Sequence, residues 1–145
     1  MDKESILVSE CFLGIKCRYN GEISTNEEIV ALGDKYNLIP VCPEVLGGLF
    51  TPRPAAERLG ELVVNKEGED VTSYFKLGAE MTVAIALKHG CQQAVLKAQS
   101  PSCGCGLIYD GTFSGKKIIG NGVTAAKLLE MNINVVTENT LQSLK

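Results

Sequence analysis

The sequence predicts an α/β fold: a single Rossmann-like domain with a mostly parallel sheet of about four strands and helices on both faces. Short apolar runs alternate with amphipathic segments along the 145 residues, which is typical of parallel strands joined by helices. The chain length is that of one domain, so residues 1–145 are expected to form one unit. Three of the apolar runs lead into loops that contain cysteine together with glycine or proline.

The elements follow from this pattern in chain order. The expected strands are residues 6–9, 38–41, 94–98 and 134–137, with a further short strand at 61–65. Helices are expected from a cap at Thr25 or Asn26 to Gly33, from a cap at Asp70 or Thr72 to about Lys88, over residues 123–131, and as a last turn at 141–144. The stretch 43–57 is rich in glycine and proline and longer than most connections, which predicts a binding loop or a lid.

Composition and charge exclude several classes of protein. The net charge of −3 gives no basic footprint for DNA or RNA. No apolar run approaches the roughly 20 residues of a membrane helix, and the N-terminus lacks the apolar segment of a signal peptide. We therefore expect a cytoplasmic protein that binds neither DNA nor a membrane, with homodimer formation left open. Six cysteines in such a chain favour a metal, a cluster or catalysis over a disulfide framework.

Cys11, Cys42 and Cys103 carry the strongest chemical signal. Each follows a predicted strand, and ligands of parallel sheets bind beyond the carboxyl ends of the strands, so the three thiols are expected to surround one point. Thiolates select zinc, copper(I) or iron–sulfur clusters, and three protein ligands leave one metal position open. The simpler interpretation is that all three are buried structural cysteines.

Two further cysteines lie close to these three in the sequence. Cys17 shares a loop with Cys11 and is interpreted as a fourth ligand, a sulfur carrier or a wall of the pocket. Cys105 lies two residues after Cys103, and its side chain is expected to point away from the ligand.

Four polar residues are candidates for the remaining chemistry. Glu44 follows Cys42 and a proline, where a fixed carboxylate can act as general base on a water molecule or can be a plain surface acid. Ser100 and Ser102 flank a proline and either relay a proton or simply form the turn. Arg53 stands between two prolines and binds an anion, closes over the site, or is an ordinary surface arginine.

At these residues the chain resembles the thiouracil desulfidase family. The resemblance rests on five motifs in order: VSxCFLGxxCRYxG from Val8, PVCPEVLGG from Pro40, TPRP from Thr51, GxDVT from Gly68, and SPSCGxG with IYDGTFSG from Ser100. Three positions depart from the expected pattern, namely Glu10, Asn20 and Cys105.

The resemblance implies a [4Fe-4S] cluster held by Cys11, Cys42 and Cys103, whose fourth iron takes the sulfur of a thiolated nucleobase such as 2-thiouracil. Glu44 and Ser100 map onto the catalytic residues of the family, and we assign Arg53, Ser102 and Cys17 to substrate binding. The expected products are uracil and hydrosulfide, without net electron transfer.

Two alternatives belong to other classes of protein. One is a structural domain in which a closed zinc site uses Cys11, Cys17, Cys42 and Cys103. The other is a cluster protein that transfers sulfur to a partner and carries a persulfide on Cys17, without turnover of its own.

Overall fold

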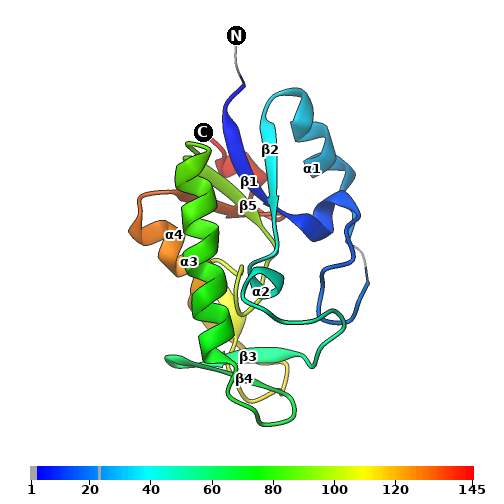
Figure 1. The fold of residues 1–145 in the computed structure, drawn as a ribbon, viewed down its shortest axis with the longest axis vertical. Helices are drawn as coiled ribbons and strands as arrows, with labels where there is room; N and C mark the ends of the chain where they lie inside the picture. Colours follow the sequence, from blue (N-terminus) through cyan, green and yellow to red (C-terminus); the bar gives the residue numbers. More distant parts are fainter. Residues whose placement is uncertain (1–2, 23) are drawn as a thin grey trace.

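A four-stranded, entirely parallel sheet forms the centre of the protein (Figure 1). The structure is a computed structural model that describes residues 3–22 and 24–145. The strands are β1 (Ser5–Ser9), β2 (Asn37–Val41), β5 (Gln93–Leu96) and β8 (Asn134–Thr137), in the order β2-β1-β5-β8. The predicted α/β class and the four-stranded parallel sheet are confirmed.

The strand order reverses direction between β1 and β5. From β1 the chain first adds β2 on one side, with Ser9 opposite Val41, and later adds β5 on the other side, with Val8 opposite Val95. Such a reversal opens a crevice at the carboxyl ends of the two central strands, where open α/β sheets bind ligands. The three loops that carry Cys11, Cys42 and Cys103 all start at this edge of the sheet.

Helices cover both faces of the sheet, as the sequence predicts. On one face lie α3 (Thr72–Lys88) and α4 (Val123–Glu130), over a core of Leu7, Ala94 and Leu96. The other face packs against η1 (Glu10–Leu13), α1 (Glu27–Ala31) and the C-terminal turn η3 (Leu141–Ser143). The successive residues Ile6, Leu7 and Val8 of β1 are fully buried because they pack alternately into the two cores.

The short helix α2 (Pro43–Leu46) is seated directly on α3. A Cβ atom built on Gly78 of α3 would lie 1.9 Å from the Pro43 carbonyl oxygen, and one on Gly47 would lie 2.0 Å from the Tyr74 carbonyl oxygen. Only glycine permits this backbone-to-backbone approach. The contact fixes the helix that follows Cys42 and carries Glu44.

Several elements differ from the sequence-based expectation. The stretch 43–57 is not one open loop, because it contains α2 and the start of the hairpin β3 (Ala56–Leu59) to β4 (Leu62–Asn65), which confirms the short strand at 61–65. A second hairpin, β6 (Leu107–Tyr109) to β7 (Lys117–Ile119), follows Cys103 and Cys105, where no strand is expected from the sequence. A 3₁₀ segment, η2 (Leu32–Asp34), extends α1. No helix among residues 3–22 and 24–145 is long and apolar enough to cross a membrane.

Candidate functional site

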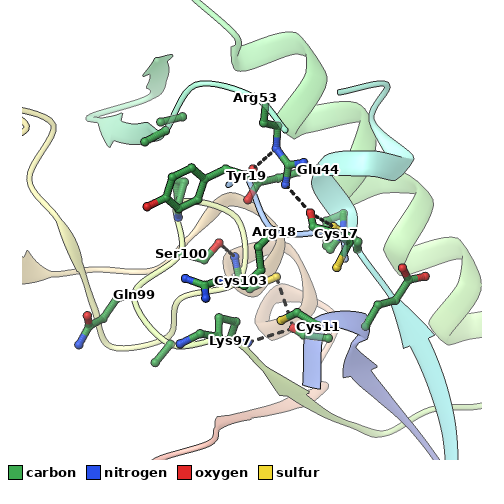
Figure 2. A pocket seen from close by; sticks show the side chains of 18 of the residues that line it. Cys11, Cys17, Arg18, Tyr19, Glu44, Arg53, Lys97, Gln99, Ser100 and Cys103 are labelled. Atoms are coloured by element: carbon green, nitrogen blue, oxygen red, sulfur yellow. Dashed lines mark hydrogen bonds and ion pairs between the residues drawn. The ribbon is translucent and has the colours of Figure 1, made fainter. Parts of the chain in front are cut away.

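A cavity of about 360 Å³ opens at the carboxyl edge of the sheet (Figure 2). Cys11, Cys42 and Cys103 all line it, so the predicted convergence of the three strand-end cysteines is found in the structure. Cys17, Glu44, Arg53 and Ser100 line the same cavity. Seven of the eight residues expected at the site are therefore brought together.

The thiols of the cavity lie close enough to influence one another. A hydrogen bond from Cys17 lowers the pKa of Cys11, while the bond to Cys11 raises the pKa of Cys17 to about 12. The pKa of Cys42 is raised, chiefly by its hydrogen bond with Cys17, and burial raises that of Cys103. Neighbouring thiolates also repel one another, so several of them ionise together only when a cation lies between them.

The donor set fits an iron–sulfur cluster better than a single ion. Three mostly buried thiols border a cavity wide enough for a group larger than one atom, and all of them are free cysteines. In the described part of the chain, no three His, Cys, Asp or Glu side chains are arranged to hold one metal ion. The closed four-cysteine zinc site considered from the sequence is not formed by these side chains.

The two remaining cysteines lie elsewhere. The Cys105 thiol points to the Val135 carbonyl oxygen at 3.8 Å, on the side of β8, which agrees with the prediction that it turns away. Cys91 lies at the opposite end of the sheet in a separate hollow beside Gly90 and Gln93.

Glu44 is held by Arg53 and lies beside Ser100. Arg53 Nε donates to Glu44 Oε1 at 3.1 Å, and the exposed fractions of the two side chains are 6% and 16%. Burial raises the pKa of the Glu44 carboxyl, while the charge and hydrogen bond of Arg53 and a hydrogen bond from Ser100 oppose the rise. Glu44 is thus a carboxylate in a poorly solvated position with its orientation fixed.

The Ser100 hydroxyl has its own fixed direction. Its oxygen accepts the backbone N–H of Ser102 at 3.1 Å and that of Cys103 at 3.0 Å. With both acceptor positions used, the hydroxyl proton is free to point to Glu44. Ser100 therefore connects the loop that carries Cys103 to the candidate base.

Arg53 lines the cavity, but most of its hydrogen bonds are made within the protein. Besides Glu44, the Arg53 guanidinium donates to the carbonyl oxygens of Cys17 at 2.9 Å and Phe50 at 3.0 Å and to Thr51 Oγ1 at 3.0 Å. The donors of Arg53 are almost all used inside the protein, which makes this side chain a brace between loops.

Ser102 is fully buried, does not line the cavity and shares a 2.7 Å hydrogen bond with Thr124. The assignment of Ser102 to substrate binding is wrong for this reason.

A hydrogen-bond network behind Cys103 is not predicted by the sequence pattern. The Lys97 backbone N–H donates to Ser9 Oγ at 3.0 Å, and Ser9 Oγ donates to Cys103 Sγ at 3.8 Å. Glu138 accepts Lys97 Nζ at 2.6 Å and the Ala98 N–H at 2.7 Å. The signal for this network in the sequence is Lys97, a charged residue next to the apolar residues of β5. The sequence pattern instead predicts residues 97 and 98 as part of that strand.

Comparison with known proteins agrees with this geometry. The family model of 2-thiouracil desulfurase matches residues 6–140, which is nearly the whole chain and includes every cysteine and polar residue of the cavity. The chain belongs to this family. The 2-thiouracil desulfurase family therefore accounts for the motifs that surround Cys11, Cys42 and Cys103.

Two relatives extend the similarity. The solved structure of a [4Fe-4S]-dependent thiouracil desulfidase, TudS, is 46% identical and superimposes with a TM-score of 0.93, covering 98% of this chain and 95% of its own. The uncharacterized protein YbbK of Bacillus subtilis is also 46% identical, over 96% of this chain and 99% of its own length. Both similarities span nearly the whole chain rather than the motifs alone.

Proposed function

We propose that this protein is a [4Fe-4S]-dependent desulfidase that removes sulfur from a thiolated nucleobase of the 2-thiouracil type. The observation that carries the proposal is one cavity in which three strand-end thiols face a fixed pair, Glu44 and Ser100. The similarity to TudS over the whole fold supports the same function.

Cys11, Cys42 and Cys103 would hold the cluster, because they are the three cavity cysteines that follow three neighbouring strands. A [4Fe-4S] cluster with three protein ligands supplies one iron without a protein ligand, which is a Lewis acid for a thiocarbonyl sulfur. Cys17 lines the same cavity, and its carbonyl oxygen accepts a hydrogen bond from the Cys42 thiol at 3.6 Å, so Cys17 would shape the cavity wall beside the thiolates.

Glu44 would act as the general base. It lies in the cavity, is oriented by Arg53 at 3.1 Å, and can accept one proton from a water molecule that attacks the thiocarbonyl carbon. The new C–O bond replaces the C–S bond, and the sulfur leaves as hydrosulfide while uracil is released. The second water proton would leave with the sulfur, and Ser100, whose oxygen already accepts two backbone N–H groups, would donate its hydroxyl to Glu44 and hold that carboxylate in position.

The test is turnover of 2-thiouracil by anaerobically reconstituted protein, with uracil measured by chromatography and iron and acid-labile sulfide measured in the same sample. The proposal predicts uracil release that needs the cluster. Glu44→Gln keeps the hydrogen bond from Arg53 and should keep the iron content but lose turnover, whereas the exposed Glu80→Gln on α3 should keep both.

Two results would contradict the proposal in different ways. A cluster-loaded wild-type protein that leaves every thiolated pyrimidine intact would remove the desulfidase function. Full activity in Glu44→Gln would leave the function standing but remove Glu44 as the base.

A further inference from the structure

Tyr19 is a half-exposed aromatic side chain in the wall of the thiol cavity. It lies two residues after Cys17 in the same loop, and 42% of its surface is exposed to solvent. Figure 2 shows its ring beside Ser100, on the same side of the cavity, with Arg53 next to it. A large aromatic ring exposed inside a polar catalytic cavity is a typical ligand contact.

The backbone that carries this ring is fixed. The Arg53 backbone N–H donates to the Tyr19 carbonyl oxygen at 2.7 Å, and Arg53 Nη2 donates to the Cys17 carbonyl oxygen at 2.9 Å. The adjacent Arg18 donates to Ser24 Oγ at 2.8 Å. The backbone at Tyr19 is thus held in place, and the ring itself takes no part in these hydrogen bonds.

The second tyrosine of the cavity wall is occupied by the protein itself. The Tyr109 hydroxyl donates to Gln99 Oε1 at 3.4 Å, and Lys117 Nζ lies 5.7 Å from the centre of the Tyr109 ring. For Tyr19, no side-chain hydrogen bond or cation–π contact is formed with residues 3–22 and 24–145. Of the two rings in the cavity wall, Tyr19 is the one available to a ligand.

We propose that Tyr19 determines specificity by stacking on the flat heteroaromatic ring of the substrate. This inference rests on the proposed function, which places the sulfur-bearing end of the substrate among the thiols and Glu44. The rest of such a substrate is a planar ring, and stacking on an aromatic side chain recognises a base by its π face. The substrate class is therefore a cyclic, aromatic thiocarbonyl compound rather than any small thiocarbonyl compound.

The test compares Tyr19→Leu and Tyr19→Phe with Tyr74→Leu, which changes a tyrosine of nearly equal exposure on α3 outside the cavity. Binding of uracil to the cluster-loaded protein is measured by equilibrium titration, because uracil has the same ring and needs no turnover. Tyr19→Leu should weaken uracil binding about 5- to 150-fold, the equivalent of about 1–3 kcal/mol for one stacked base. Tyr19→Phe, which keeps the ring, and Tyr74→Leu should bind uracil as the wild type does.

Turnover of thiourea provides a second comparison, because thiourea has the same thiocarbonyl group between two nitrogens but no ring. In Tyr19→Leu, the KM for 2-thiouracil should rise while any turnover of thiourea stays unchanged. Unchanged uracil binding in Tyr19→Leu, or an equal loss toward thiourea, would overturn the stacking role. If the wild type turns over neither compound, the proposed function fails, and the uracil titration still decides the role of Tyr19.

Discussion

Removal of the Arg53 side chain is expected both to lower the stability of the protein and to abolish the role of Glu44 in turnover. The guanidinium joins α2, the loop of Cys17 and the segment around Phe50 by four side-chain hydrogen bonds. The bonds to Phe50 and Thr51 lie nearer the surface, where water can replace the arginine. The bonds to Glu44 and to the Cys17 carbonyl lie in the cavity wall, and two hydrogen bonds from a charged group are worth about 3–6 kcal/mol.

The ion pair between Arg53 and Glu44 gives a similar magnitude. Arg53→Ala leaves Glu44 as an unpaired carboxylate in a poorly solvated position, and breaking such a pair costs about 3–5 kcal/mol. We therefore expect Arg53→Ala to lower the free energy of unfolding by about 3–5 kcal/mol. Arg53→Lys keeps the charge but not the planar fork, so its loss should be smaller.

The assay is urea unfolding of anaerobic protein followed by far-UV circular dichroism, with the exposed Lys127→Ala on α4 as the control. Turnover and iron content are measured on the same samples, and Arg53→Lys should retain iron while losing most turnover. A loss of less than about 1 kcal/mol in Arg53→Ala, the size of an average point mutation, would refute the reasoning.

Two further predictions concern α3. Gly78→Ala should destabilise the protein by about 1–3 kcal/mol through overpacking and lower kcat, because the new Cβ meets the Pro43 carbonyl and displaces α2. Ala84→Gly, at an exposed position of the same helix, should cost only about 1 kcal/mol by helix propensity and leave kcat unchanged; equal kcat values in the two variants would contradict the prediction. Asp70→Ala should lower stability at neutral pH, because hydrogen bonds from Thr72 lower the pKa of Asp70, and the difference from the wild type in urea unfolding should vanish as the pH falls below about 3.9 and through that lowered pKa. A difference that persists in acid would exclude the carboxylate as its source.

The sheet and its cysteines were predictable because their signals are local. Apolar runs of four or five residues specify the parallel strands, and the position of each cysteine after a strand places it at the carboxyl edge. The long helix α3 follows from its apolar periodicity and from the Asp70 carboxylate that accepts the Thr72 N–H at 2.9 Å. These features need no knowledge of distant contacts.

The missed features depend on contacts between distant segments. Of the two hairpins the sequence predicts only β4, because β3, β6 and β7 are three or four residues long and lie in or beside stretches that glycine and proline mark as loops. The brace formed by Arg53 joins residues up to 36 positions apart, so its type alone did not show whether it faces a ligand or a carboxylate. The sequence pattern assigns Ser102 to the cavity with Ser100, but the Ser102 hydroxyl is paired with Thr124 of α4 and does not line the cavity.

The central claim is that the cysteines after β1, β2 and β5 hold an iron–sulfur cluster. Its most direct test is the iron and acid-labile sulfide content of anaerobically reconstituted protein in which each cavity cysteine is changed to serine in turn. Cys11→Ser, Cys42→Ser and Cys103→Ser should each lose the cluster, whereas Cys17→Ser and the control Cys105→Ser should retain it. A wild-type protein that takes up zinc but no cluster, or a Cys103→Ser variant with a full complement of iron and sulfide, would contradict the account.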